Sequence, residues 1–320
     1  MNRTTKLGLV LTLSAGVMSN GSAGEAIRPA GPIGGTDIRQ ALMPPPGVYV
    51  GAAGVGLGLE HFWNGDDRLE SHGSSRMAGV GIAVVYDTQL WGGSLGSTLA
   101  THYERTCFGL KSMKKACGEG QGDTYTDVLM WGKNLSASPD TPNPTPWIPY
   151  GLNVLVGLGV TIPTGKYSAK EGMNVGSNVY DFAPNVALTY ITPSVFGQGW
   201  GDATEFSGRL FYNMYTKNDD TDYKSGDILS LDFAISQRFG QWQAGVAGST
   251  FTQLKDDRLN GEVAPNDGNR AKALNLGPVV AYDFMWDGVP WSISAKGLLT
   301  VMGENIAGGP GLAIRIGRKL

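Results

Sequence analysis

Residues 231–251, LDFAISQRFGQWQAGVAGSTF, alternate large apolar side chains with small or polar ones. Up to Phe239 the large apolar residues occupy odd-numbered positions, and beyond Gly240 the apolar residues occupy even-numbered positions. Because successive side chains of a β-strand point to opposite faces, this pattern indicates two half-buried strands joined by a turn at Gly240. A chain built from many such stretches folds into a β-sandwich or a β-barrel.

The same alternation recurs along the whole chain, and its phase breaks divide the chain into twelve predicted strands. No comparable stretch carries the 3.6-residue period of an amphipathic helix, so the predicted fold class is all-β. The strands run longer than the roughly 5–6 residues usual in soluble sheets. They are predicted near residues 47–62, 76–88, 95–106, 123–131, 148–162, 177–191, 204–216, 227–239, 241–254, 271–285, 290–302 and 306–319.

The connections between the predicted strands alternate in kind. Long, charged stretches such as TKNDDTDYKSGD and KDDRLNGEVAPNDGNR alternate with short ones such as MWDGVP, with longer exceptions at 132–147 and 192–202. An outer-membrane barrel has long loops on one side of the membrane and short turns on the other. A soluble sandwich gives no reason for this alternation. The sequence therefore predicts an antiparallel up-and-down transmembrane β-barrel of about twelve strands.

Seven of the eight tryptophans fall at the predicted short-turn ends of strands. An indole has an apolar body and one N–H donor, so it favours the boundary between lipid tails and water. A ring of such residues at one end of a barrel is an aromatic girdle. The predicted interface girdle consists of Trp91, Trp131, Trp147, Trp200, Trp242, Trp286 and Trp291.

Two segments precede the first predicted strand. Residues 1–23 combine Arg3 and Lys6, the apolar run LGLVLTLSAGVM and a small-residue exit, which is the pattern of a secretory signal peptide. Residues 24–46 are rich in Pro and Gly and show no period. They predict either a disordered periplasmic tail, which we favour slightly, or a plug in the lumen with TDIRQAL as one helical turn. The predicted barrel comprises residues 47–320.

Composition limits the partners and the redox state. The net charge is −3, and 17% of the residues are charged, so nothing favours binding to nucleic acid or to an anionic membrane surface. Cys107 and Cys117 are the two cysteines of a chain predicted to leave the cytoplasm. They predict one loop disulfide, with two free thiols as the alternative. No His lies among them, so no metal site is predicted.

The strand faces that do not meet lipid are predicted to line the lumen. Both signs of charge occur there, which argues against a phosphate pore and against a simple cation channel. The alternative is that these residues pair and only hold the barrel together. Twelve strands lie between the roughly eight whose interior side chains fill and the 16–18 of open porins, so the lumen is predicted to be narrow. The candidates are Glu60, Asp87, His102, Glu104, Asp127, Asn153, Asp181, Asn185, Arg209, Asn213, Asp232, Arg238, Asp283, Lys296 and Arg315.

Motifs that would indicate an enzyme fail. GVTIPTGKYS is one residue too long for a phosphate loop and has Tyr167 where Ser or Thr is needed, and GVGLGLE has no following helix. His102 and Glu104 share a predicted inward face, which raises a barrel enzyme acting on lipids. No serine has a recognisable nucleophile setting, however. We predict no catalytic residue and no cofactor.

The sequence also resembles a known family. The resemblance is carried by ALMPPPGVYVGAAG, TIPTGKY, NVGSNVYDFAPNVALTYITP, FSGRLFYNMYTKNDDTDYKSGDILSLDFAISQRF, QAGVAGSTFTQLKDD and NIAGGPGLAIRIGRKL, from about Leu42 onward. These stretches resemble the outer-membrane proteins grouped as the meta-pathway phenol-degradation family. The resemblance implies a transporter or porin associated with catabolism of aromatic or other hydrophobic compounds. The family name does not denote an enzymatic activity.

These patterns predict an integral protein of the Gram-negative outer membrane, with both termini periplasmic because the strand number is even. The expected function is passive uptake of small aromatic or hydrophobic compounds. The alternatives are a barrel enzyme acting on lipids and a structural barrel with a closed lumen. Expected partners are outer-membrane lipids, a small-molecule substrate that the sequence does not identify, and barrel-assembly machinery, whose recognised closing strand GLAIRIGRKL resembles. The sequence does not determine the oligomeric state.

Overall fold

The computed structural model describes residues 35–320 apart from residue 66, the stretch 137–148 and residues 198 and 266. The predicted signal peptide, the stretch 24–34 and Trp147 therefore lie outside the described residues. Among the residues that are described, no helix is both long enough and apolar enough to cross a membrane.

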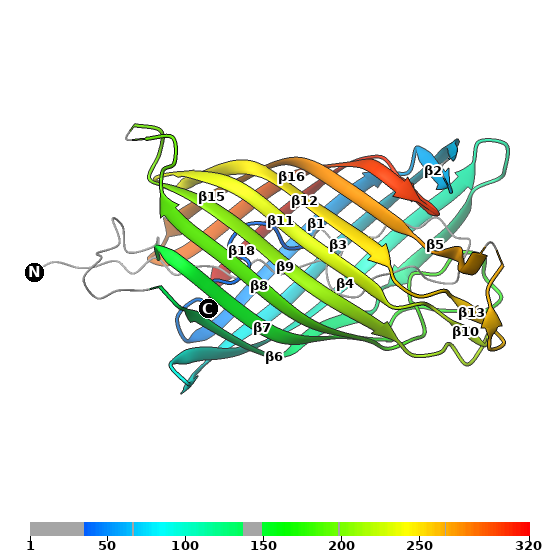
Figure 1. Ribbon diagram of the computed structural model, residues 1–320, viewed down its shortest axis with the longest axis horizontal. Helices are drawn as coiled ribbons and strands as arrows, with labels where there is room; N and C mark the ends of the chain where they lie inside the picture. The colour runs from blue at the N-terminus through cyan, green and yellow to red at the C-terminus, as the bar shows by residue number, and fades with distance from the viewer. Residues whose placement is uncertain (1–34, 66, 137–148, 198, 266) are drawn as a thin grey trace, which may run out of the picture.

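Twelve antiparallel strands form one closed barrel (Figure 1). Each strand pairs with its neighbour in chain order, and the last pairs with the first, where Tyr49 lies opposite Lys319. The predictions of an all-β fold and of twelve strands are confirmed. The barrel strands are β1 (Gly47–Gly58), β3 (Asp67–Leu90), β4 (Gly93–Leu110), β6 (Thr124–Asn134), β7 (Gly151–Ile162), β8 (Asp181–Pro193), β9 (Ala203–Tyr215), β11 (Ile228–Phe239), β12 (Trp242–Gln253), β15 (Lys272–Trp286), β16 (Val289–Glu304) and β18 (Pro310–Lys319).

Short elements occupy five of the connections at one end of the barrel (Figure 1). We call this the long-loop end and the opposite end the short-turn end. The C-terminus lies at the short-turn end, where the amide of Leu320 donates to the carbonyl of Val48. The short elements are β2 (His61–Asn64), β5 (Ala116–Gln121), β10 (Tyr223–Lys224), β13 (Arg258–Leu259), β14 (Glu262–Val263), β17 (Ile306–Gly308) and the 3-10 helix η1 (Asp267–Asn269).

The two-residue turns at the short-turn end have the chemistry of tight hairpins. Trp91 and Gly92 have φ of 51° and 71°, and Asp287 and Gly288 have φ of 52° and 74°. A type I′ turn requires positive φ at both central residues, and its twist matches the twist of the flanking strands. These turns hold β3 against β4 and β15 against β16 in register.

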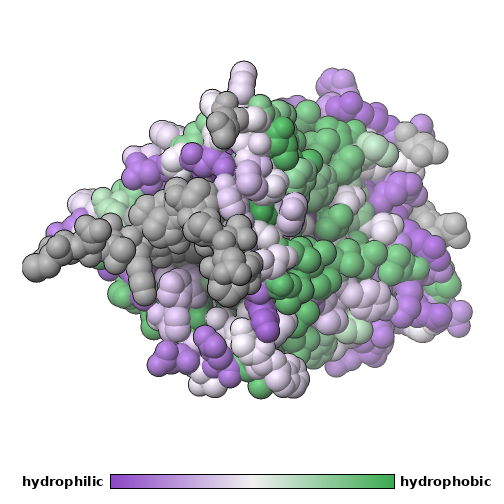
Figure 2. All heavy atoms as spheres, turned by 60° about the vertical axis from the view of Figure 1, so that its left-hand side comes forward, coloured by the Kyte–Doolittle hydropathy of each residue, from purple (hydrophilic) through white to green (hydrophobic). Residues whose placement is uncertain are grey.

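The stretch 231–251 forms β11, a tight turn and β12. Ile235 and Val246 lie opposite each other on the outer wall and are 56% and 57% exposed. Asp232 and Ser249 also lie opposite each other, and both are buried inside the barrel. Figure 2 shows hydrophobic residues gathered around the middle of the wall, with hydrophilic residues toward its two ends. An apolar outer band around a polar interior is the pattern of an outer-membrane barrel.

Several strand ends differ from the predicted ones. β1 ends at Gly58 rather than near residue 62, because the chain turns there into β2, which pairs with the start of β3. β3 and β4 are longer than predicted because β2 and β5 pair with the parts that project at the long-loop end. These extensions depend on loops that fold back, which the alternation within a strand does not encode.

The seam between β4 and β6 is irregular. Their pairing stops at Gly96 and resumes at Ala100. Between these points the amide of Asp127 donates to Thr98 Oγ1 (2.9 Å), and Thr126 Oγ1 donates to the carbonyl of Thr98 (2.5 Å). Side-chain hydroxyls therefore replace part of the backbone ladder. Such a bulge re-aims side chains, and here Asp127 is buried in the interior.

Candidate functional site

Polar and charged side chains cover much of the interior wall. Twelve of the fifteen predicted lumen-lining residues are buried there, and the side chain of His102 is 11% exposed. The buried residues come from both halves of the chain. They are Glu104, Asp127, Asn153, Asp181, Asn185, Arg209, Asn213, Asp232, Arg238, Asp283, Lys296 and Arg315.

Two of the predicted lumen-lining residues are exposed. Glu60 is exposed because β1 has already ended at Gly58, and because the odd-numbered side chains of β1 face inward. Asp87 is exposed near the short-turn end, where the register between β3 and β4 shifts beyond Val85. For these two residues a place in the lumen stays a prediction.

Residues 35–46, which we call the N-terminal segment, cross the interior. Asp37, Ile38 and Ala41 are at most 2% exposed. The segment does not pair as a strand. Instead, three consecutive backbone amides donate to side chains of β8 and β9. These bonds run from Arg39 to Glu205 (2.5 Å), from Gln40 to Ser207 (3.0 Å) and from Ala41 to Thr189 (3.0 Å).

The position of the N-terminal segment corrects the slight preference for a periplasmic tail. Buried residues with partners on several strands are held in place by those contacts. The stretch TDIRQAL also forms no helical turn. Arg39 has a φ of 61°, and the amide of Leu42 donates to the carbonyl of Arg39 (3.0 Å), which is the hydrogen bond of a β-turn.

Asp37 links the N-terminal segment to two neighbouring strands. Its carboxylate lies 2.6 Å from Arg315 on β18 and 3.3 Å from Lys296 on β16. All three side chains are at most 6% exposed. Thr36 adds hydrogen bonds from its amide (3.0 Å) and hydroxyl (2.7 Å) to Asp232 on β11. Buried charges require such partners, because removing them from water is costly.

Arg39 forms a second ionic contact with the wall. Its guanidinium binds both carboxylate oxygens of Asp283 on β15, at 3.0 and 2.9 Å. Arg238 on β11 binds the same carboxylate at 3.0 Å. Gln243 accepts hydrogen bonds from Arg39 (2.8 Å) and Arg238 (2.9 Å) and donates one to Glu205 (2.9 Å). The segment thus carries one anion and one cation, and each meets the opposite charge on the wall.

A third cluster joins β6, β8 and β9. Arg209 contacts Asp127 at 2.7 Å, and its guanidinium donates twice to Asn185 at 3.0 and 2.7 Å. The hydroxyl of Tyr125 donates to Asp127 (3.0 Å), and Arg209 lies 4.8 Å from the ring centre of Phe211. The alternation of side chains along the strands predicts that Asp127, Asn185 and Arg209 face inward, and here the three residues are in contact. They narrow the interior with fixed, paired charges.

The long-loop end carries an apolar cluster, which sequence reasoning missed. Trp63 on β2 and Ile306 on β17 pack with residues at the ends of four barrel strands and in the loop before β8. Its short strands show too little alternation to be recognised. We call it the mouth cluster, and it consists of Trp63, Val179, Tyr215, Ile228, Phe251, Ala271, Ala273 and Ile306.

β2 has apolar contacts on both of its faces. Phe62, next to Trp63, packs with Leu59, Ala307 and Phe108 on the side of β4. Adjacent residues of a strand point to opposite faces, so β2 lies between the mouth cluster and this second group. The buried members of both groups are at most 8% exposed, so apolar side chains fill this part of the long-loop end.

Carboxylates tie the loops of this end together. Asp123 accepts hydrogen bonds from the amides of Gly165 and Ser177, both at 2.8 Å. The stretch that superficially resembles a phosphate loop is therefore an anchored connection. Asp257 accepts a hydrogen bond from the amide of Gly226 (2.8 Å). Burial raises the pKa of Asp257, and the hydrogen bonds that its carboxylate accepts oppose that rise.

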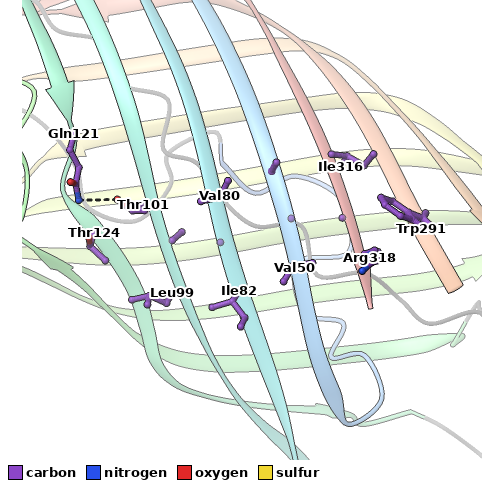
Figure 3. Close-up of a pocket in the computed structure, with 15 residues that line it drawn as sticks. Val50, Val80, Ile82, Leu99, Thr101, Gln121, Thr124, Trp291, Ile316 and Arg318 are labelled. Carbon is purple, nitrogen blue, oxygen red and sulfur yellow. Dashed lines mark hydrogen bonds between the residues drawn. The ribbon is translucent and has the colours of Figure 1, made fainter. Parts of the chain in front are cut away.

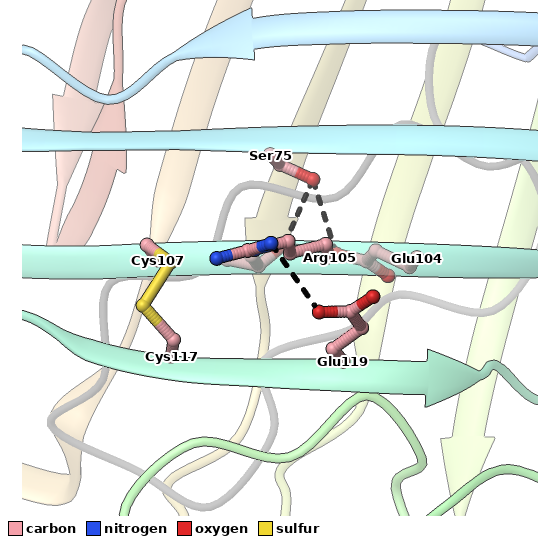
Figure 4. The surroundings of a disulfide bond; sticks show 7 residues. Ser75, Glu104, Arg105, Cys107, Cys117 and Glu119 are labelled. Carbon is pink, nitrogen blue, oxygen red and sulfur yellow. Dashed lines mark hydrogen bonds and ion pairs between the residues drawn. A yellow bond between two sulfur atoms is a disulfide. The ribbon is translucent and has the colours of Figure 1, made fainter.

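Cys107 on β4 and Cys117 on β5 lie opposite each other in register and form a disulfide (Figure 4). Arg105 and Glu119, on the outer face of the same two strands, lie 3.5 Å apart. The disulfide therefore closes a hairpin at the long-loop end. It contributes no group to the clusters inside the barrel.

The surroundings of His102 do not form a nucleophile and base. Its Nε2 lies 3.7 Å from Glu104 Oε2. The hydroxyls of Ser75 (3.1 Å) and Thr106 donate to the same Glu104, and no hydrogen bond to His102 Nε2 exists within the described chain. A serine nucleophile needs its base within hydrogen-bond reach. Among the described residues no group of three His, Cys, Asp or Glu side chains has metal-site geometry.

The bounds of the strands place the six girdle tryptophans that the structure describes at the short-turn end. Trp91 and Trp286 are 81% and 65% exposed. Trp242 lies 4.6 Å from Tyr282, and Trp286 lies 5.6 Å from Trp291, measured between ring centres. Trp147 lies in the stretch that is not described. The remaining members at this end are Trp131 and Trp200.

The sequence was compared with known proteins. The model of the family described as "Putative MetA-pathway of phenol degradation" matches residues 78–316, which is more than half of the chain. The chain belongs to this family. The match to the phenol-degradation family spans most of the barrel, from β3 to β18. A search of the curated proteins found no match.

Solved structures share the fold of this family member. An outer membrane channel from Pseudomonas putida F1 is 13% identical, with a TM-score of 0.69, over 89% of this chain and 100% of that chain. The transport unit of the autotransporter AIDA-I from Escherichia coli is 9% identical, with a TM-score of 0.50, over 89% of this chain and 92% of that one. At these identities the likeness concerns the fold alone.

Proposed function

We propose that this protein is an outer-membrane channel for passive uptake of small aromatic or other hydrophobic compounds used in catabolism. The twelve buried polar residues line its path. The N-terminal segment closes the path at the short-turn end, and the mouth cluster forms its entrance. No covalent step takes place, so transport follows the concentration gradient of the solute.

The observation that carries this proposal is how the N-terminal segment is held. Asp37, Arg39 and the neighbouring amides bind the wall through ion pairs and side-chain hydrogen bonds, and none of the residues 35–46 belongs to a strand. A segment held in this way can leave without breaking any backbone pairing of the barrel. A purely structural barrel has no need of a separable occlusion.

The apolar mouth cluster supports the choice of solute. The apolar side chains packed at the long-loop end favour passage of a hydrophobic compound over a sugar or an ion, because water is released when apolar surfaces meet. The family description and the channel from Pseudomonas putida F1 are consistent with this role.

In the membrane, the long-loop end faces the exterior and both termini face the periplasm. The tryptophans of the short-turn end then lie at the periplasmic boundary of the lipid. Barrel-assembly machinery inserts the chain.

Liposome permeability tests the proposal. The full-length mature protein is reconstituted, and entry of phenol, benzoate and glucose is measured against protein-free liposomes and against an unrelated outer-membrane barrel of known closed lumen. We expect faster entry of phenol than of glucose. A parallel assay measures the growth of a deletion strain on limiting aromatic carbon sources.

Equal, background-level permeability to all three solutes would contradict the channel and favour the structural barrel. Restoration of growth by a conductance-negative variant would also contradict it. Release of fatty acid from outer-membrane lipids by the purified protein, abolished by His102→Ala, would favour the enzyme instead.

A further inference from the structure

We propose that a groove on the lipid-facing wall binds one anionic phospholipid, with its phosphate on Arg318 and one acyl chain along the groove. The groove crosses the outer surface of β18, β1, β3 and β4, on the opposite side of the wall from the lumen (Figure 3). This proposal goes beyond uptake and does not depend on it.

The groove has a volume of about 650 Å³. Two rows of residues opposite one another in register line it, and Figure 3 shows their side chains spread along its length. The rows are Arg318, Val50, Ile82 and Leu99, and Ile316, Ala52, Val80 and Thr101. A row from β18 to β4 crosses three strand spacings, roughly 15 Å.

Small side chains on β1 create the hollow. Ala52 forms its floor between the larger Ile316 and Val80, which are 38% and 61% exposed. Further along the same face of β1, a Cβ added at Gly54 or Gly56 would meet no atom within 4 Å. The wall is therefore thin along β1, and the neighbouring strands β18 and β3 form the sides of the groove.

Arg318 is the one ionisable residue among those that line the groove. Its guanidinium lies 5.3 Å from the ring centre of Trp291, which fixes its place at the short-turn end. No carboxylate of the described chain lies within ion-pair distance of it. An arginine with a tryptophan beside an apolar surface matches a lipid phosphate at the membrane boundary. The opposite end of the groove holds only the neutral polar groups of Thr101, Gln121 and Thr124.

The cation and the apolar floor of the groove together match one kind of ligand. A neutral hydrocarbon would leave the guanidinium without a counter-charge. A second copy of this chain seated groove to groove would bring two arginines together without a carboxylate. A free phosphate would make no use of the apolar floor. An anionic phospholipid satisfies both parts of the groove at once.

Native mass spectrometry of the full-length mature protein in detergent tests the proposal. Phosphatidylglycerol and phosphatidylethanolamine are titrated separately, and the fraction of protein that retains one lipid is measured. We expect one phosphatidylglycerol per chain, bound about tenfold more tightly than phosphatidylethanolamine, because hydrogen bonds to a charged group are strong. Arg318→Gln should remove this preference, and Arg318→Lys should keep part of it.

A second variant tests the apolar part of the groove. Ala52→Phe fills the floor of the groove from the lipid side and leaves Arg318 in place. It should weaken the binding of both lipids at least fivefold. The matched controls are Ala244→Phe, an exposed alanine on the outer wall of β12, and Lys133→Gln, which removes another cation at the short-turn end. Both controls should bind phosphatidylglycerol as the wild type does. Heat-modifiable migration on gels confirms that each variant is folded.

Several results would overturn the proposal. The two lipids could bind equally to the wild type, or Arg318→Gln could leave phosphatidylglycerol binding unchanged. Displacement by glycerol phosphate at equal concentration would indicate a plain anion site. Displacement by phenol would indicate a site for neutral solutes, and a dimer that excludes lipid would indicate a contact between chains. Because binding is measured without transport, these outcomes leave the uptake proposal untouched.

Discussion

The two ends of the barrel interior are closed by different chemistry. From the middle of the barrel toward the short-turn end, Asp37 and Arg39 of the N-terminal segment are held by charges on β15, β16 and β18. At the long-loop end, Trp63 and Ile306 pack with apolar residues from other segments in the mouth cluster. One closure is ionic and directional, and the other is apolar and non-directional.

This difference determines how each closure fails. Removing one partner of a buried ion pair leaves an uncompensated charge, which costs about 3–5 kcal/mol. An apolar cluster loses stability in proportion to the area and cavity that a substitution creates. The short-turn closure should therefore open abruptly when one charge is lost, whereas the long-loop closure should change gradually and distinguish solutes by polarity.

Asp37→Ala should have the largest effect. It leaves Lys296 and Arg315 facing an apolar methyl group, so we expect the N-terminal segment to leave the interior. Single-channel conductance in planar bilayers should rise severalfold. Asp87→Asn, an exposed carboxylate near the same end, is the control and should leave conductance unchanged. Equal conductance of Asp37→Ala and the wild type would show that the ionic contacts do not hold the closure.

Trp63→Ala should have the second largest effect. It removes the largest side chain of the mouth cluster and should lower the free energy of unfolding by about 3 kcal/mol. We expect a larger change in phenol entry into liposomes than in ion conductance. Trp91→Ala, a tryptophan that is 81% exposed, is the matched control. If both substitutions altered phenol entry equally, the mouth cluster would have no special role.

Arg209→Gln removes a paired charge from the interior wall and should change selectivity more than conductance. It leaves Asp127 without its cation, so the interior becomes more negative. We expect the reversal potential in a salt gradient to shift toward cation selectivity. Arg76→Gln, on the outer wall, should not shift it. A shift toward anions would contradict the placement of Arg209 in the path.

The paired substitution Cys107→Ser and Cys117→Ser should have the smallest effect on permeation. The disulfide closes a hairpin outside both closures. Its loss should lower the free energy of unfolding by about 2–3 kcal/mol, as expected for a short loop. Denaturant unfolding in detergent measures this change. A conductance that changed as much as in Asp37→Ala would mean that the hairpin positions the interior.

Prediction from sequence succeeded where the signal is local. The alternation of side chains between the two faces of a strand assigned Asp127, Arg209 and Arg315 to the interior without any tertiary information. It did not indicate that Glu60 and Asp87 are exposed, because the end of a strand depends on the loop that follows. The mouth cluster was missed because β2 and β17 are too short to show a period.

The position of the N-terminal segment was not available from a local pattern. Its Pro- and Gly-rich sequence has no period, and the partners that hold it are far away in the chain. Asp37 and Arg315 are separated by 278 residues, and Arg39 and Asp283 by 244. Nothing in the neighbourhood of either residue identifies the other.

The sequence by itself determined that this chain forms a membrane barrel with twelve strands, because alternation is a property of each strand alone. Only the tertiary structure decided what occupies the interior and what covers its mouth. Those contacts join residues from opposite ends of the chain, and their energy depends on burial that exists only once the barrel has closed. Closure of the barrel also leaves a thin wall along β1 on the lipid side. The apolar groove there ends at Arg318 on the neighbouring strand β18.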